Sequence, residues 1–271
     1  MLPSKVFKIL VPNVTQACLI ASCLHTSGSL HKTKKPSKIK GCDPTPVAIV
    51  LCGVGGLDGT EIAEAVSIAI HCSENNLLPR FYAPDIEIVG LVNHLTKKPD
   101  DRNAPRNALI EAARLARPAI QSLCECEPGS AEALIIPGGY GAARTLSDFA
   151  SKGADCTVLP ELRRVMEEFN CDRKPIGTLC IATSLVAKVF KGAKVTLGKE
   201  GPEEDWPYAE AIKQVKKMGA KIEFKDVTGV SYCKTYNVFS NPAWLYACAT
   251  FGEVHKGIGN MISKMRKNIV R

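Results

Sequence analysis

From residue 47 onward, short runs of apolar residues alternate with longer segments in which apolar residues recur every three or four positions. The short runs, such as VAIVLC at 47–52, are typical of strands buried on both faces of a parallel sheet. Strands are predicted at 47–52, 80–83, 86–92, 132–136, 174–178, 193–197, 221–224, 227–232 and 235–239. Helices are predicted at 60–75, 106–117, 159–168, 182–188, 208–218 and through most of 242–271. This alternation predicts an α/β fold, with a mainly parallel sheet and helices on both faces.

Three of the predicted loops follow strands and carry candidate chemistry, at residues 53–61, 137–144 and 179–184. Ligands of parallel sheets bind at the carboxyl ends of the strands, so these loops are expected to meet at one edge. The first loop, GVGGLDG, has neither the spacing of a dinucleotide-binding fingerprint nor the Lys-Ser/Thr pair of a P-loop. No cofactor is therefore expected.

The N-terminal segment differs in composition from the rest of the chain. Residues 1–42 contain no Asp or Glu, and their seven lysines account for all but one unit of the formal net charge of +8. Acid-poor segments of this kind are typical of transit peptides, although this one lacks arginine. Residues 1–43 are interpreted as a targeting segment with its linker, and residues 44–271 as one domain. We expect a mitochondrial (matrix) location, with secretion or the cytoplasm as alternatives.

The remaining composition limits the partners and the metal chemistry. No long basic stretch is left beyond the N-terminal lysines, so nucleic-acid binding is not expected. No run approaches the roughly 18 apolar residues of a membrane span, so membrane insertion is not expected either. The 12 cysteines include no CxxC pair, and only three histidines lie beyond residue 42. We therefore predict reduced cysteines and no metal site.

Cys180 is the strongest candidate for a reactive side chain. It lies in KPIGTLCIATSLVAK, where the strand predicted at 174–178 meets the helix predicted at 182–188. Unpaired amide groups at a helix N-terminus favour the thiolate, and several α/β enzymes present their nucleophile on such a turn. The alternative is an ordinary buried cysteine, since cysteine is among the most often buried residues.

Three further features could complete a site around this thiol. Glu61, in the first turn of a predicted helix, either complements the helix dipole or points into the site beside a sulfur. Gly138 and Gly139 either form a simple turn or present their amide groups to an anion. His94 is the best-placed imidazole for a cysteine–histidine pair, with an ordinary loop histidine as the alternative.

Several motifs occur together in an order that resembles a known superfamily. They are LDGTE, YAPD, VNHLTKKP, ALIIPGGYGAARTLSDFA, KPIGTLCIA, LGKEGPEEDWPYAEAI and HKGIGNMISK. This set is similar to the class I glutamine amidotransferase-like (deglycase/PfpI) superfamily. It is most similar to the branch of the enhancing-lycopene-biosynthesis protein ElbB, a glyoxalase, and its mitochondrial animal homologues. The resemblance extends from residue 47 to the C-terminus.

The resemblance implies a flavodoxin-like sandwich that forms a homodimer. It implies that Cys180 is the nucleophilic elbow cysteine and that Glu61 is the carboxylate beside it. It also implies a substrate or oxyanion pocket built from backbone groups. The residues expected to line this pocket are Gly55, Gly56, Gly138, Gly139 and Ile181.

The activity that the resemblance implies is a cofactor-independent glyoxalase or deglycase reaction on small aldehydes, with glyoxal converted to glycolate. Cys180 would add to the aldehyde as a thiolate, and Glu61 would move the proton that gives the hydroxy-acid thioester. Such an enzyme would be classed as a lyase or hydrolase.

Three positions depart from the pattern of the relatives. Ala63 and Lys199 stand where histidine is frequent, and Thr183 replaces a common proline. The chain has no clear triad histidine, so glutamine amidotransferase activity is not expected. Two alternatives to an enzyme stay open, because fold does not determine function. One is a redox-responsive protein whose Cys180 oxidises, and the other is a catalytically weak binding homologue.

Overall fold

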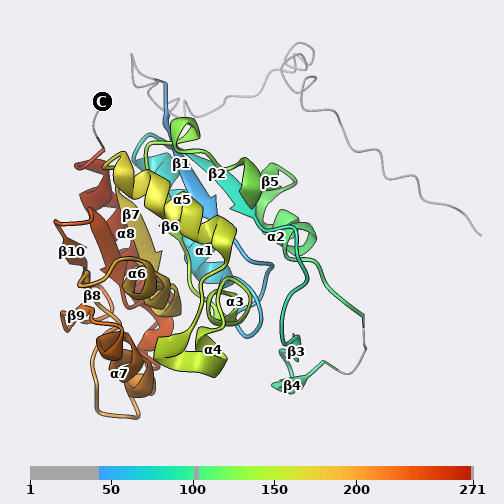
Figure 1. The fold of residues 1–271 in the computed structure, drawn as a ribbon, viewed down its shortest axis with the longest axis vertical. Helices are drawn as coiled ribbons and strands as arrows, with labels where there is room; N and C mark the ends of the chain where they lie inside the picture. The colour runs from blue at the N-terminus through green and yellow to red at the C-terminus, as the bar shows by residue number, and fades with distance from the viewer. Residues whose placement is uncertain (1–42, 101–103, 270–271) are drawn as a thin grey trace, which may run out of the picture. The chain divides into compact units, whose positions relative to one another are not determined.

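The computed structural model describes residues 43–100 and 104–269. The targeting segment predicted at 1–43 lies outside these residues, apart from Asp43. Within the described part, the fold is built on a seven-stranded sheet with the order β10-β11-β7-β6-β1-β2-β5 (Figure 1). All neighbouring strands are parallel except β10 and β11, which pair antiparallel. Its strands are β1 (Thr45–Val50), β2 (Leu77–Ala83), β5 (Ile120–Ser122), β6 (Leu134–Ile136), β7 (Ile176–Leu179), β10 (Ser231–Cys233) and β11 (Val238–Asn241).

Helices connect these strands, and two small ladders lie apart from the main sheet. The longer helices are α1 (Ile62–Glu74), α2 (Ala108–Ala116), α5 (Pro160–Cys171), α6 (Thr183–Val189), α7 (Ala209–Lys217) and α8 (Phe251–Arg266). The shorter ones are α3 (Tyr140–Arg144) and α4 (Phe149–Lys152). The ladders pair β3 (Val92–Asn93) with β4 (Lys98–Pro99), and β8 (Lys194–Val195) with β9 (Lys221–Ile222).

The strand order reverses direction between β6 and β1. The chain leaves β1 through α1 toward β2, whereas it leaves β6 through α5 toward β7, in the opposite direction across the sheet. Right-handed crossovers therefore place α1 and α5 on opposite faces, and α5 lies in front of the strands in Figure 1. The crevice between the carboxyl ends of β6 and β1 is thus a topological switch point, where ligands of such sheets bind.

The predicted architecture is confirmed, but two strand predictions differ from the structure. The segment 86–92 does not form one continuous strand: Val89 is 55% exposed and Gly90 takes a left-handed φ of +69°. An isolated bridge between Glu87 and Asn107 forms there, and only the last residue, Val92, belongs to a strand, β3. The strand predicted at 227–232 begins only at Ser231, as β10.

The sequence pattern also missed short elements. The edge strand β5 has three residues and no continuous apolar run. The helix expected from residue 242 begins at Phe251, where Thr250 and Glu253 form a capping box.

No helix among the described residues has both the length and the apolar character needed to cross a membrane.

Candidate active site

The candidate site lies where four adjacent strands end at the same edge of the sheet. Strands β1, β6, β7 and β11 lead into the loop 51–61, the loop 137–139, the turn η5 (Cys180–Ala182) and the turn η6 (Ala243–Leu245), respectively. The three loops predicted to carry chemistry therefore meet. The fourth segment, η6, was not predicted as part of the site.

The backbone of Gly138 connects the loop after β6 to the start of α1. Its N–H donates to Glu64 Oε2 at 2.7 Å, and its carbonyl accepts from the Glu61 N–H at 2.9 Å. A Cβ at Gly138 would lie 2.5 Å from Cys180 Cβ, 2.9 Å from Glu64 Oε2 and 3.1 Å from Cys180 Sγ. The carboxyl group and the thiol therefore lie together on the side of Gly138 where a side chain would project, and glycine is required because no side chain fits.

Glu64 is the acid that is buried beside the thiol. Its exposed fraction is 0%, and its Oε1 has no hydrogen-bond partner among the described residues. Burial, followed by the nearby charge of Glu61, raises the pKa of the Glu64 carboxyl to about 8, although the Gly138 N–H favours the ionised form. A protonated carboxyl group is therefore expected below about pH 8.

Cys180 occupies a strained turn at the end of β7. Its φ is +53°, a left-handed conformation that is rare outside glycine, and the residue is only 8% exposed. Burial and then the negative charge of Glu64 raise the pKa of the Cys180 thiol well above its usual value. The N–H groups of Ile181 and Gly139 act in the opposite direction.

The raised pKa of the Cys180 thiol corrects the expectation that the helix N-terminus favours a thiolate. Amide groups do face the sulfur, but burial and the neighbouring acid outweigh them. The turn η5 also separates Cys180 from α6, which begins at Thr183. In the resting protein, Cys180 is therefore a thiol whose proton must have an acceptor before the sulfur can attack.

Glu61 serves both roles that the sequence left open. It is the N-cap of α1, where its Oε2 accepts from the Glu64 N–H at 2.7 Å. Its side chain also lines the same cavity as Cys180, and partial burial raises its pKa. The structure thus places two carboxyl groups of one helical turn near the thiol, with Glu64 the more deeply buried.

A cavity of about 180 Å³ opens in front of the thiol. Its walls are Gly56, Leu57, Glu61, Gly139, Tyr140, Cys180, Ile181, Tyr208, Trp244 and Leu245. Burial, followed by the nearby Tyr140 and Cys180, raises the pKa of Tyr208 to about 12, so Tyr208 is a hydrogen-bond donor at neutral pH. Trp244 Nε1 is buried without a partner in the described part of the chain, yet lies near enough to Glu61 to lower its pKa.

Only some of the residues expected to line the backbone pocket do so. Gly56, Gly139 and Ile181 line the cavity. The Gly138 N–H is occupied by Glu64, so Gly138 offers no donor to a substrate, and Gly55 is not a lining residue. The available amide groups therefore belong to Gly139 and Ile181. No group of three His, Cys, Asp or Glu side chains in the described ranges could hold a metal ion.

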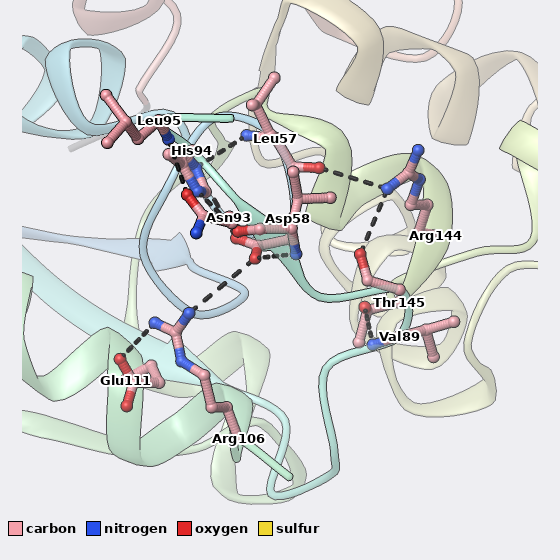
Figure 2. A network of polar contacts seen from close by, with 12 residues as sticks. Leu57, Asp58, Val89, Asn93, His94, Leu95, Arg106, Glu111, Arg144 and Thr145 are labelled. Atoms are coloured by element: carbon pink, nitrogen blue, oxygen red, sulfur yellow. Dashed lines mark hydrogen bonds and ion pairs between the residues drawn. The ribbon is translucent and has the colours of Figure 1, made fainter. Parts of the chain in front are cut away.

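His94 is not the partner of the thiol. Figure 2 shows it beside Asp58, where its Nε2 accepts from the Leu57 N–H at 3.2 Å and lies 3.8 Å from Asp58 Oδ1. A Cβ at Gly55 would lie 2.6 Å from the same ring nitrogen. His94 is absent from the walls of the cavity and instead supports the glycine-rich loop. The sequence could not predict this position of His94, because the path of residues 86–100 across the molecule is set by tertiary contacts.

The sequence patterns did not single out Glu64, Tyr208 or Trp244 as site residues. A signal for Glu64 was present, because it lies four and eight residues before Ile68 and Cys72 on the buried side of α1. An acid on the apolar face of a helix is unusual unless it is partnered. Tyr208 and Trp244 come from irregular segments, which carry no comparable periodic signal.

The Gly138→Ala variant tests whether the packing at this peptide is as tight as the geometry indicates. The added methyl group would displace the Cys180 or Glu64 side chain, so we expect a loss of about 1–3 kcal/mol in the free energy of unfolding. Gly129→Ala is the matched control, because a Cβ there would meet nothing within 4 Å. Urea unfolding of both variants measures the difference. Equal stabilities would contradict the tight packing of Cys180 and Glu64 against Gly138.

Comparisons with known proteins place the chain among its relatives. No family model matches. The rat "ES1 protein homolog, mitochondrial" is 40% identical over 252 residues, which cover 91% of this chain and 94% of the rat protein. The human "glutamine amidotransferase-like class 1 domain-containing protein 3, mitochondrial" is 40% identical over 220 residues, which cover 81% of each chain.

Solved structures agree with this placement. The crystal structure of an isoprenoid biosynthesis protein with an amidotransferase-like domain from Ehrlichia chaffeensis has a TM-score of 0.74 and 28% identity. The match covers 83% of this chain and all of that chain. The 24 kDa rapid encystment protein of Francisella tularensis, with a TM-score of 0.52 and 11% identity over 84% of this chain and all of its own, shows only a shared fold.

The names of the curated relatives bear on the location as well as on the family. The rat, human and zebrafish proteins are all named mitochondrial, which confirms the predicted mitochondrial location. With 40% identity across most of both chains, the family assignment is direct. The chain belongs to the family of mitochondrial ES1 and glutamine amidotransferase-like class 1 domain proteins.

Proposed function

We propose that this chain is a cofactor-independent enzyme of glyoxalase type. It acts on small α-oxoaldehydes and converts glyoxal to glycolate. The observation that carries the proposal is the placement of Cys180 next to Glu64 against Gly138, with Cys180 on the wall of a cavity of about 180 Å³. A buried thiol with its own proton acceptor and a small cavity in front of it suits attack on a small carbonyl compound.

The first step forms a carbon–sulfur bond. The reacting form is the one in which Glu64 is ionised, and its share grows as the pH approaches 8. This carboxylate takes the Sγ proton of Cys180 while the sulfur attacks the aldehyde carbon. The aldehyde oxygen then receives that proton, which leaves a hemithioacetal and restores the carboxylate. The N–H groups of Gly139 and Ile181, which face the sulfur, are suitably placed to stabilise the transient negative charge.

The second step is an internal redox reaction that needs no external oxidant. Glu61, on the cavity wall, removes the C–H proton of the former aldehyde carbon and returns it to the neighbouring carbonyl carbon, while the hydroxyl proton of the first carbon passes to the neighbouring oxygen. The first carbon is thereby oxidised to a thioester and the second is reduced to an alcohol. Water then cleaves the C–S bond, which releases glycolate and restores the Cys180 thiol. Partial burial raises the pKa of Glu61, as a general base at neutral pH requires.

Turnover of glyoxal tests the proposal directly. The purified protein should form glycolate without glutathione, and Cys180→Ala should lower kcat/KM by at least about a hundredfold, because the covalent intermediate is lost. Cys72→Ala is the matched control, since Cys72 is a buried cysteine on α1 away from the cavity walls. Glycolate formation at the same rate in the Cys180→Ala variant would contradict the proposal.

A redox-responsive protein is the second candidate, favoured by the two N–H groups at the sulfur. These groups would stabilise a sulfinate formed by peroxide. Peroxide oxidation and glycolate formation, measured on the same protein preparation, distinguish the two functions. Oxidation confined to Cys180, without Cys180-dependent glycolate formation, would favour the redox function. Uniform oxidation of all the cysteines would count against it.

We further propose that the chain forms a homodimer in the mitochondrial matrix. Ile62, Val66 and Ile70 form an apolar line along α1, with exposed fractions of 48%, 42% and 43%. A second copy of the chain would cover this line and remove its apolar surface from water. Sedimentation of the purified protein should show a dimer, and Val66→Glu should shift it toward the monomer. A wild-type monomer at micromolar concentration would contradict this proposal.

A further inference from the structure

A second, larger cavity adjoins the one that holds Cys180. Its volume is about 520 Å³, and it shares the lining residues Tyr140, Ile181 and Tyr208 with the reactive cavity. The two tyrosines therefore stand between the two spaces. A substrate no larger than glyoxal would leave the larger cavity empty. In a longer substrate, the end that is remote from the aldehyde group would occupy it.

Arg144, at the end of α3, lies on the wall of this outer cavity. Its guanidinium group lies 5.1 Å from the centre of the Tyr140 ring. Its Nη1 donates to the backbone oxygens of Gly90 at 3.3 Å and Leu57 at 3.4 Å. The contact with Leu57 can be followed in Figure 2. Its other nitrogens, Nε and Nη2, make no hydrogen bond within the described residues, and no described carboxylate lies within 4.0 Å of it. Within the described residues, the guanidinium thus has unused donors and no counterion.

The other charged side chains around the outer cavity are already neutralised. Lys152 pairs with Asp148 at 2.7 Å. Glu210 lies 3.5 Å from Lys213 and accepts a hydrogen bond from Gln214 at 2.7 Å. Arg144 is consequently the positive group on this wall that is best suited to bind an anion, and a guanidinium can hold a carboxylate or phosphate through two parallel hydrogen bonds.

We propose that Arg144 binds an anionic group at the remote end of the substrate, so that the enzyme prefers acidic α-oxoaldehydes to neutral ones. This inference rests on the proposed function. The aldehyde end reaches Cys180, the chain of the substrate passes Tyr140 and Tyr208, and the carboxylate or phosphate lies against Arg144. The reaction at the aldehyde is unchanged, and Arg144 acts as a specificity-determining residue.

A matched pair of substrates tests the preference. 4,5-Dioxopentanoate and 2-oxopentanal have the same α-oxoaldehyde group and differ in the terminal carboxylate. The wild-type protein should show a higher kcat/KM for the acidic compound, and Arg144→Gln should lower the ratio of the two values at least tenfold. Arg144→Lys, which keeps the charge and loses the two-pronged geometry, should lower the ratio less.

Lys152→Gln is the control for general electrostatic effects. It removes a positive charge from the same region, but one that is paired with Asp148. The ratio of kcat/KM values should not change in this variant. An equal fall in the ratio for Lys152→Gln and Arg144→Gln would overturn the assignment to Arg144, as would an unchanged ratio in Arg144→Gln.

A binding measurement keeps this inference separate from the proposed function. Pentanoate and propyl phosphate should slow the alkylation of Cys180 by iodoacetamide, whereas 1-pentanol at the same concentration should not, and Arg144→Gln should abolish the protection. The relative effect of the two anions shows whether a carboxylate or a phosphate is preferred. If glyoxal turnover fails while protection depends on Arg144, the proposed function is wrong and the anion site stands. If glyoxal turnover depends on Cys180 and the anions do not protect Cys180 from alkylation, the proposed function stands and the anion site is wrong.

Discussion

The arrangement of the site depends on one constraint: a carboxyl group and a thiol are buried side by side against the backbone of Gly138. These groups belong to Glu64 and Cys180, and the environment of both disfavours negative charge. Two adjacent anions would be far more costly than one, so the pair titrates as a unit. Once the pair has lost one proton, near pH 8, it carries a single negative charge, which can move from the carboxylate to sulfur and then to a substrate oxygen. This transfer turns a poorly acidic thiol into a usable nucleophile.

The fold supplies this arrangement through the ends of adjacent strands and the glycine-rich turns that follow them. The loops after β1 and β6 are joined by backbone hydrogen bonds, from Tyr140 N–H to Gly56 O at 2.9 Å and from Gly141 N–H to Gly59 O at 3.0 Å. Asp58 is fully buried behind the first loop and accepts from the Val92 N–H at 2.9 Å. These contacts hold the start of α1, and hence both glutamates, in a defined position relative to the elbow at Cys180. Preorganisation of this kind matters because small displacements weaken catalysis.

The sequence pattern was sufficient to predict the α/β architecture, the elbow position of Cys180 and the convergence of three loops. The buried strands are continuous apolar runs, and the nucleophile turn lies between a clear strand and a clear helix. The roles of the two glutamates could not be separated in the same way. Which of them points inward depends on the residue at which α1 begins, and Ile62 as the first helical residue makes Glu61 the cap and turns Glu64 toward Gly138. His94, Tyr208 and Trp244 lie in irregular segments, whose paths are set by tertiary contacts that periodicity does not reveal.

The most direct test of this account is the alkylation rate of Cys180 as a function of pH, followed by mass spectrometry of its peptide. In the wild-type protein, the rate should rise in two steps, the first near pH 8 as the pair loses its shared proton. Glu64→Gln should remove the first step and leave a single rise at higher pH, because burial alone then sets the pKa of the thiol. Glu61→Gln, the same change three residues earlier, should retain both steps. Identical profiles in the wild type and Glu64→Gln, with one rise near the free-thiol value of about 8.5, would contradict the coupling on which the mechanism depends.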